Sequence, residues 1–253
     1  MSDHSSSDAA AGPTSQLTPY PDELVTLIAH ELRSPLAAIS NAVVLWRPGT
    51  SPQTLANVQD ILARQVNKAL RLVDDLLDVS RLEFVIVQDR VDLLQVIAEA
   101  VQEIEHQIRV HQQGLALELP ADPLFVRGDA MRLQQVVVNL LGNASKYSPS
   151  GGHITLRLVR ESRQAVLRVR DGGRGISPEN LPRIFDPFFR AGTSFDPRLE
   201  GLGLGLTLAQ RVIERHEGTI GAQSDGPNRG SEFTVRLPVI GATAPATDSP
   251  VDL

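Results

Sequence analysis

Two long apolar stripes in the first third of the chain constrain its fold most strongly. Both show the alternating spacing of three and four residues that is typical of one face of an α-helix, and a break rich in Pro and Gly at residues 47–52 separates them. The first stripe consists of Leu24, Ile28, Leu32, Leu36, Ile39 and Val43. The second consists of Leu55, Val58, Leu62, Ala69, Leu72, Leu76 and Val79, interrupted by Gln65. The pattern predicts a helical hairpin.

A hairpin of two amphipathic helices leaves part of its apolar surface uncovered. Pairing two such hairpins into a four-helix bundle would bury that surface. We therefore predict a homodimer in which residues 21–86 of each copy supply two helices.

The rest of the chain alternates between helical and strand patterns. Helices are predicted at residues 91–108, 129–147, 178–185 and 202–216, and strands at 115–119, 153–160, 165–170, 219–224 and 233–237. This order predicts an α/β sandwich over residues 87–240, so the expected fold class is α+β. The segments 1–20 and 241–253 are small, polar and Pro-containing, and we expect them to be disordered.

Composition and charge argue against several classes of function. The net charge of −6 gives no support to nucleic-acid binding, and the absence of cysteine excludes disulfides, zinc–thiolate sites and cysteine nucleophiles. No apolar run approaches the ~20 residues that a membrane span needs. The first 16 residues also lack the features of a signal peptide. A cytoplasmic chain without a membrane span is expected.

His30 is the first candidate for chemistry, in the sequence HELRSPL. It lies two residues from both Ile28 and Leu32, about 200° from the stripe, so it should point outward. A lone histidine there would be an ordinary solvated side chain. However, the Glu31 carboxylate could hold one ring N–H while the other nitrogen acts as a nucleophile. Pro35 would free a backbone carbonyl in the same helix, unless it marks a boundary between two shorter helices.

A second candidate is one face of the helix predicted at residues 129–147. Spacings of four and three place Asn139, Asn143, Lys146 and Tyr147 together. Amide oxygens are acceptable ligands for Mg²⁺, and a lysine is a compact counter-charge for phosphate. On its own this face could equally be a solvated one.

Three loop motifs add to this picture. In DGGRGI, Asp171 could accept a hydrogen bond from an exocyclic amine, while nearby glycines let a flat ring approach the backbone. Taken alone, the motif fits an ordinary glycine turn better. In GLGLGL, backbone N–H groups at a helix start could wrap phosphates, although the motif is neither a Walker A nor a convincing Rossmann sequence. IFDPFFR is either a local apolar anchor or the hinge of a lid over nucleotide.

Together these motifs resemble those of the sensor histidine kinases of two-component systems. HELRSPL is similar to their phosphoacceptor H-box, NLLGNASKY to the N-box, DGGRGI to the first glycine box, IFDPFFR to the F-box and GLGLGL to the second glycine box. The order and spacing agree over about residues 22–238. The resemblance implies a dimerisation and histidine-phosphotransfer hairpin at residues 21–86. It also implies an ATP-binding domain at residues 87–240 with the GHKL (Bergerat) fold shared with gyrase and Hsp90.

The resemblance also implies the activity. His30 would take the γ-phosphate of ATP, helped by Glu31, and pass it to an Asp of a response-regulator receiver domain. Mg²⁺ would be bound by Asn143. The residues implied in nucleotide binding are Asn139, Asn143, Lys146, Tyr147, Asp171, Gly173, Gly175, Phe185, Gly201, Gly203 and Gly205.

Two positions bear on the mechanism. Related hydrolases carry a Glu where this chain has Asn139, and an amide cannot activate water, so Asn139 favours transfer to His30 over hydrolysis. Ser34 stands where kinases with phosphatase activity commonly have Thr or Asn, so phosphatase activity is not implied.

Several alternatives stay open at this point. One is a scaffold of the same fold that binds nucleotide or a receiver without phosphorylation, and another is an ATP-hydrolysing conformational machine. No segment before Pro21 could form a sensor, so sensing would fall to a separate protein or to a missing part of a longer chain. Transfer within a protomer and transfer across the dimer are both compatible with the sequence.

Overall fold

The computed structural model describes residues 21–47, 50–80, 87–190 and 201–240. The predicted disordered tails at residues 1–20 and 241–253 lie outside these ranges. The chain divides into two compact units, Met1–Val66 and Asn67–Leu253. This division falls inside a helix, whereas the sequence places the domain border at residues 86 and 87, and that border stays a prediction.

Both helices predicted from the two stripes are present, as α1 (Pro21–Leu45) and α2 (Pro52–Ser80). Each helix begins at a proline, which suits the first helical position because its missing N–H would have no partner there. The Ser51 hydroxyl accepts the Thr54 N–H at 3.2 Å and so caps the start of α2. Because α1 runs without interruption through Pro35, the alternative of two shorter helices is wrong.

The helix α2 carries a second apolar row besides the predicted stripe. In the predicted stripe, Val58 is 2% and Leu72 is 8% exposed. The second row is spaced four, three and four residues apart, and its members are 42–56% exposed: Val66, Leu70, Val73 and Leu77. Apolar side chains on two faces of one helix are typical of a helix with neighbours on more than one side.

A five-stranded sheet organises the second unit, in the order β2-β4-β5-β7-β6. Its strands are β2 (Gly114–Glu118), β4 (His153–Glu161), β5 (Gln164–Asp171), β7 (Ser231–Pro238) and β6 (Thr219–Gln223). The strands β2 and β4 are parallel and the other neighbours are antiparallel. A small antiparallel pair, β1 (Asp89–Asp92) with β3 (Phe125–Gly128), accompanies this sheet.

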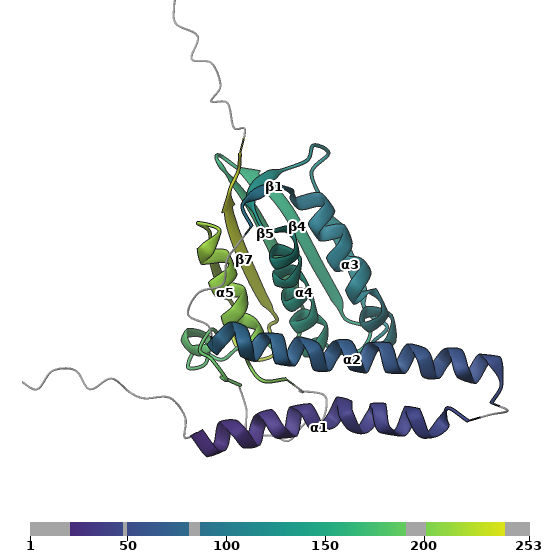
Figure 1. Cartoon of the computed structure of the whole chain (residues 1–253). Helices are drawn as coiled ribbons and strands as arrows, with labels where there is room; N and C mark the ends of the chain where they lie inside the picture. The colour runs from purple at the N-terminus through teal and green to yellow at the C-terminus, as the bar shows by residue number, and fades with distance from the viewer. Residues whose placement is uncertain (1–20, 48–49, 81–86, 191–200, 241–253) are drawn as a thin grey trace, which may run out of the picture. The chain divides into compact units, whose positions relative to one another are not determined.

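Three helices cover one face of the sheet: α3 (Leu93–Val110), α4 (Ala130–Tyr147) and α5 (Gly205–Arg215). Figure 1 shows them in front of β4, β5 and β7. Asp92 and Asp129 cap α3 and α4 by accepting the N–H groups of Leu94 and Arg132. The core between these layers holds fully buried aliphatic side chains that include Leu140, Leu141, Ile154, Leu156 and Ile213. The predicted α+β class is therefore confirmed.

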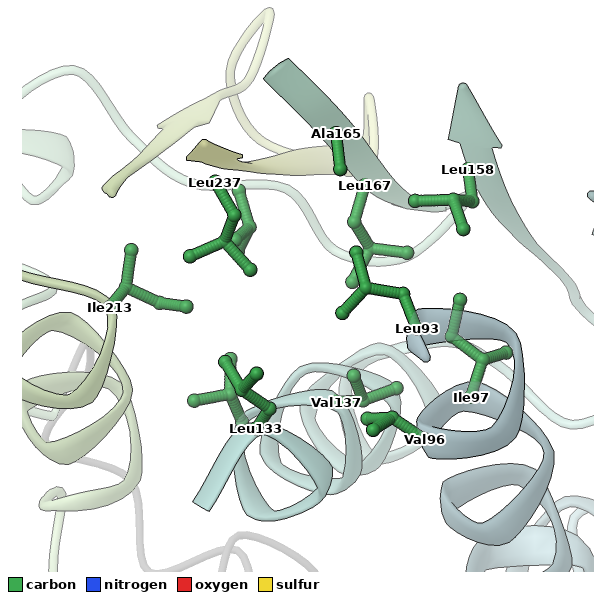
Figure 2. A pocket seen from close by; sticks show the side chains of 12 residues that line it. Leu93, Val96, Ile97, Leu133, Val137, Leu158, Ala165, Leu167, Ile213 and Leu237 are labelled. Carbon is green, nitrogen blue, oxygen red and sulfur yellow. The ribbon is translucent and has the colours of Figure 1, made fainter. Parts of the chain in front are cut away.

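A small apolar cavity remains inside this core. Its volume is about 20 Å³, and Figure 2 shows side chains from α3, α4, α5 and the sheet around it, including Ile97, Val137, Ala165 and Leu237. An apolar space of this size is a packing defect of the core. It is not a nucleotide site, because its lining offers a charged ligand no polar partner.

Some predicted elements were wrong in extent. The sequence places residues 91–108 in one helix, but Val91 lies in β1 and α3 begins at Leu93. The strands β1 and β3 were not predicted, because four residues are too few to show a period. The helix predicted at 178–185 shrinks to a 3₁₀ turn, Leu181–Arg183, and the one predicted from residue 202 begins at Gly205. No helix in the described part of the chain is long and apolar enough to cross a membrane.

Candidate nucleotide-binding site

A pocket of about 80 Å³ opens where α4, the end of β5, the start of α5 and the start of β7 converge. It is lined by Asn143, Tyr147, Asp171, Arg174, Gly175, Ile176, Ile184, Phe189, Arg190, Leu206, Ser231 and Phe233. Its lining combines apolar and polar side chains, as expected where a flat ring must be buried while a charged tail leaves the protein.

Asp171 forms the polar floor of this pocket. Its side chain is 5% exposed, and both carboxylate oxygens are engaged. Oδ1 accepts the Gly173 N–H at 2.8 Å, and Oδ2 accepts the Ser231 hydroxyl at 2.5 Å. Each oxygen keeps a lone pair, so the fixed carboxylate can accept a further hydrogen bond from an amine on a bound ring.

Two glycines allow the chain to pass closely beside Asp171. A Cβ atom at Gly173 would lie 2.4 Å from the Tyr147 carbonyl oxygen. Gly175 has a φ of +67°, and a Cβ there would lie 2.1 Å from the Gly226 carbonyl oxygen. Any side chain at these two positions would displace the loop, so Gly173 and Gly175 are required by packing.

Cationic and amide groups gather around Tyr147 at the end of α4. Tyr147 carries two cations near its ring, with Arg174 Cζ 4.2 Å and Lys146 Nζ 5.2 Å from the ring centroid. Asn143 lies one helical turn before Tyr147 and also lines the pocket. Positive charge beside an amide is the environment that a polyphosphate prefers.

The helix α5 presents its N-terminus to the same region. No side chain caps it at Leu204, so its first N–H groups are not satisfied by a capping side chain and favour an anion. Asn139 Nδ2 donates a 3.2 Å hydrogen bond to the Gly205 carbonyl oxygen and ties α4 to this end of α5. The preceding Gly203 has a φ of +72° and accepts the Phe188 N–H at 3.1 Å.

His216 holds the opposite end of α5 against α4. The buried imidazole accepts the Asp129 N–H at Nε2 (2.9 Å), and its Nδ1 lies 2.7 Å from the Val212 carbonyl oxygen. Nδ1 must therefore carry the proton of a neutral ring. Gly128 leaves room for this ring, since a Cβ there would lie 2.1 Å from His216 Cδ2. The Asn139–Gly205 bond at the start of α5 and the Asp129–His216 bond at its end together fix the glycine box relative to the N-box.

The aromatic motif at residues 184–190 is held by α5. The Thr207 hydroxyl donates a 2.9 Å hydrogen bond to the Phe185 carbonyl oxygen. Ile184 and Phe189 line the pocket, while Phe185 packs against the core instead. Phe189 thus lines the pocket and Phe185 does not, and the nucleotide-binding role of Phe185 stays a prediction.

Of the predicted nucleotide-binding residues, Asn143, Tyr147, Asp171 and Gly175 line the pocket. Asn139, Lys146, Gly173, Phe185, Gly201, Gly203 and Gly205 lie on the elements that border it. A Cβ at Gly201 would lie 3.7 Å from Lys146 Nζ, so the glycine box and the N-box lysine are neighbours. Roles for all these residues stay predictions.

The predicted phosphoacceptor region lies on α1. His30 is part of this helix, although its side chain is outside those that the structure describes. Glu31 is 4% exposed and Ser34 is half-buried. Eight lining residues were not among the predicted site residues: Arg174, Ile176, Ile184, Phe189, Arg190, Leu206, Ser231 and Phe233. Ser231 carried no signal, because it opens an ordinary strand and meets Asp171 only in the folded sheet.

The described residues contain no cluster of three or more His, Cys, Asp or Glu side chains that could hold a metal. Mg²⁺ commonly uses one or two protein ligands and takes the others from phosphates and water. Asn143 offers one such amide oxygen at the pocket, so the residues present fit a metal carried by the nucleotide.

Two family models match the chain, one for each part. Residues 22–84 match the His Kinase A (phospho-acceptor) domain, and residues 128–240 match the histidine kinase-, DNA gyrase B-, and HSP90-like ATPase domain. A phosphoacceptor hairpin followed by this ATPase-type domain defines a class of signalling protein. The chain belongs to the sensor histidine kinase family and comprises a catalytic core of the two-component type.

Curated relatives and solved structures agree with this assignment. The chain is 36% identical over 221 residues to the adaptive-response sensory kinase SasA of Parasynechococcus marenigrum, covering 86% of this chain and 57% of that protein. It is 37% identical over 222 residues to the probable sensor histidine kinase TcrY of Mycobacterium tuberculosis, covering 87% and 46%. The chain thus spans about half the length of these relatives.

Two solved structures extend the comparison. The mycobacterial sensor histidine kinase MprB matches with a TM-score of 0.53 and 29% identity, over 60% of this chain and 98% of that one. Histidine kinase ThkA, solved in complex with the response regulator TrrA, matches with a TM-score of 0.58 and 25% identity, over 85% and 61%.

Proposed function

We propose that the chain is an ATP-dependent protein-histidine kinase that phosphorylates His30 and then a response-regulator receiver domain. The observation that carries the proposal is the Asp171 carboxylate, fixed by Ser231 and Gly173 in a pocket that Asn143 and Tyr147 also line. The adenine amine would donate to Asp171, and the phosphates would extend toward Asn143, Lys146 and the start of α5.

The chemical step is transfer of the γ-phosphoryl group. A His30 ring nitrogen attacks the γ-phosphorus, the bond to the β,γ-bridging oxygen breaks, and ADP leaves. Glu31 would hold the second ring N–H. Asn139 supports transfer over hydrolysis, because its amide donates to Gly205 and cannot act as a general base toward water. Mg²⁺ bound at Asn143 would neutralise charge on the phosphates.

The proposed acceptor after His30 is an aspartate of a receiver domain. Its support is the relative ThkA, which was solved in complex with the response regulator TrrA. Since ATP and receiver domains are both cytoplasmic, the proposal also places the chain in the cytoplasm. We further propose a domain border near residues 86 and 87, between the two matched family models.

A homodimer is the proposed assembly. The exposed row Val66, Leu70, Val73 and Leu77 supports it, because such a row at heptad spacing is suited to a four-helix bundle with a second copy. Leu70→Glu should give a monomer by light scattering, whereas Leu117→Glu, on the edge strand β2 with 44% exposure, should leave the dimer intact. A dimer that survives Leu70→Glu unchanged contradicts this interface.

The pocket's role is tested by autophosphorylation with γ-labelled ATP. Asp171→Asn should lose label, because the amide would place an N–H group against the donor that the carboxylate accepts. Asp122→Asn, in an exposed turn, should be labelled like the wild-type chain. A chase with a receiver domain should move the label to it. Full labelling of Asp171→Asn would contradict the proposed nucleotide site.

A further inference from the structure

Ser224 joins two glycine-rich turns that carry residues of the pocket, without lining the pocket itself. Its hydroxyl accepts the Ile176 N–H at 2.9 Å and the Gly226 N–H at 3.3 Å. It also donates to the Gly230 carbonyl oxygen at 2.7 Å. The same proton also lies toward the Gly226 carbonyl oxygen, at 3.4 Å from Oγ. A hydroxyl has one donor and two acceptor sites, so Ser224 uses its full capacity in these bonds.

The two turns that Ser224 joins are packed against each other with little freedom. The Gly230 N–H donates to the Gly173 carbonyl oxygen at 3.0 Å, and the Asn228 N–H donates to that of Arg174 at 2.6 Å. A Cβ at Gly230 would lie 2.1 Å from the Asp171 carbonyl oxygen. Because the two backbones lie this close, the hydrogen bonds between the turns set their separation. Ser224 supplies the side-chain hydrogen bonds among them.

The partners of Ser224 are immediate neighbours of the groups that would meet the base. Ile176 lines the pocket and follows Gly175, while Gly230 precedes Ser231, whose hydroxyl holds Asp171. Moving either turn would therefore change the distance between the loop at Gly175 and the Ser231–Asp171 pair. These groups form the end of the pocket at which the adenine ring is proposed to bind.

We propose that Ser224 is a positioning residue that sets the width of the base end of the nucleotide pocket and thereby the affinity for adenine nucleotides. This inference rests on the proposed function. Binding to a preformed slot costs less than binding that must first order the slot, so loss of the Ser224 hydroxyl should weaken affinity. The phosphate end, formed by α4 and the start of α5, should be unaffected.

The test compares Ser224→Ala and Ser224→Thr, which keeps the hydroxyl, with Thr219→Ala at the other end of β6. For Ser224→Ala we expect about tenfold weaker binding. The factor should be the same for ATP, ADP and AMP by calorimetry. The KM for ATP in autophosphorylation should rise by that factor while kcat stays within about twofold. Ser224→Thr should restore binding, and Thr219→Ala should match the wild-type chain.

The outcomes separate this inference from the proposed function. Wild-type affinities in Ser224→Ala, or a fall in kcat with an unchanged KM, would overturn the inference while leaving the kinase proposal intact. Failure of the wild-type chain to bind ATP would overturn the proposed function itself. If Ser224→Ala does not fold, Ser224→Cys, with its weaker donor and acceptor, should show a smaller rise in KM, and an unchanged KM would overturn the role of the hydroxyl.

Discussion

The Ser231 hydroxyl donates a 2.5 Å hydrogen bond to Oδ2 of Asp171, across neighbouring strands of the sheet and from 60 residues further along the chain. The bond fixes the carboxylate plane at the floor of the pocket. Asp171 can then present its remaining lone pairs to a ligand without first losing rotational freedom, and this arrangement underlies the first prediction.

Ser231→Ala should lower ATP affinity about tenfold, because hydrogen bonds to charged groups contribute more than neutral ones. Titration calorimetry measures this directly. Ser162→Ala, on the exposed turn at the far end of β4 and β5, is the matched control and should bind like the wild-type chain. Equal affinity in both variants would mean that Asp171 is positioned without Ser231.

Asn139→Asp should reduce autophosphorylation at least about tenfold, because a carboxylate would replace the N–H donor to the Gly205 carbonyl oxygen and leave two acceptors facing each other. Initial rates with labelled ATP provide the measurement. Gln135→Glu, on the same helix, should keep its rate, since its Oε1 already accepts from Arg132. Wild-type activity in Asn139→Asp would show that this link between α4 and α5 is dispensable.

The apolar cavity predicts a gain in stability. Val137→Ile adds one methylene facing that space (Figure 2) and should raise the free energy of unfolding by up to about 0.8 kcal/mol. Urea denaturation tests this, with Val110→Ile as control because Val110 is 62% exposed and should gain nothing. A loss of stability in Val137→Ile would mean that the core cannot accept the group.

Glu161 predicts a specific dependence of stability on pH. Hydrogen bonds from Arg236 and then Arg168 lower the pKa of its carboxyl below the ordinary 4.5. A lowered folded-state pKa stabilises the protein above the unfolded-state pKa, and this contribution is lost as the pH falls through the folded-state value. Glu161→Gln should therefore be less stable than the wild-type chain at pH 7, and the gap should close in acid. A gap of constant size from pH 7 to pH 3 would contradict the lowered pKa.

Much of the fold followed from local patterns in the sequence. The hairpin helices and α4 were predictable because their apolar stripes are long and their start signals, such as Asp129 before Ala130, are local. The short strands β1 and β3 were not, because each of them gains its stability from pairing with a distant partner. The second row on α2 was missed for a related reason. Leu70 is as apolar as the stripe residues beside it, and only its exposure in the folded structure distinguishes it from them.

The candidate site likewise contains residues that the sequence predicts and residues that only the folded structure reveals. Asn143, Tyr147 and Asp171 belong to motifs that can be read along the chain, and all three line the pocket. Ser231, Ser224 and Arg174 act through contacts between segments far apart in sequence, such as the packing of Arg174 over Tyr147. Such contacts leave no periodicity in a single sequence, so the structure was needed to find them.

The most direct test of the central claim is the chemical identity of the phosphorylated residue. The chain would be incubated with Mg²⁺ and γ-labelled ATP, beside His30→Gln and, as control, His106→Gln on the exposed side of α3. The account predicts label that is lost in acid and retained in alkali, present in the wild-type chain and in His106→Gln and absent from His30→Gln. Label that persists in His30→Gln, or a wild-type chain that binds ATP without becoming labelled, would contradict it.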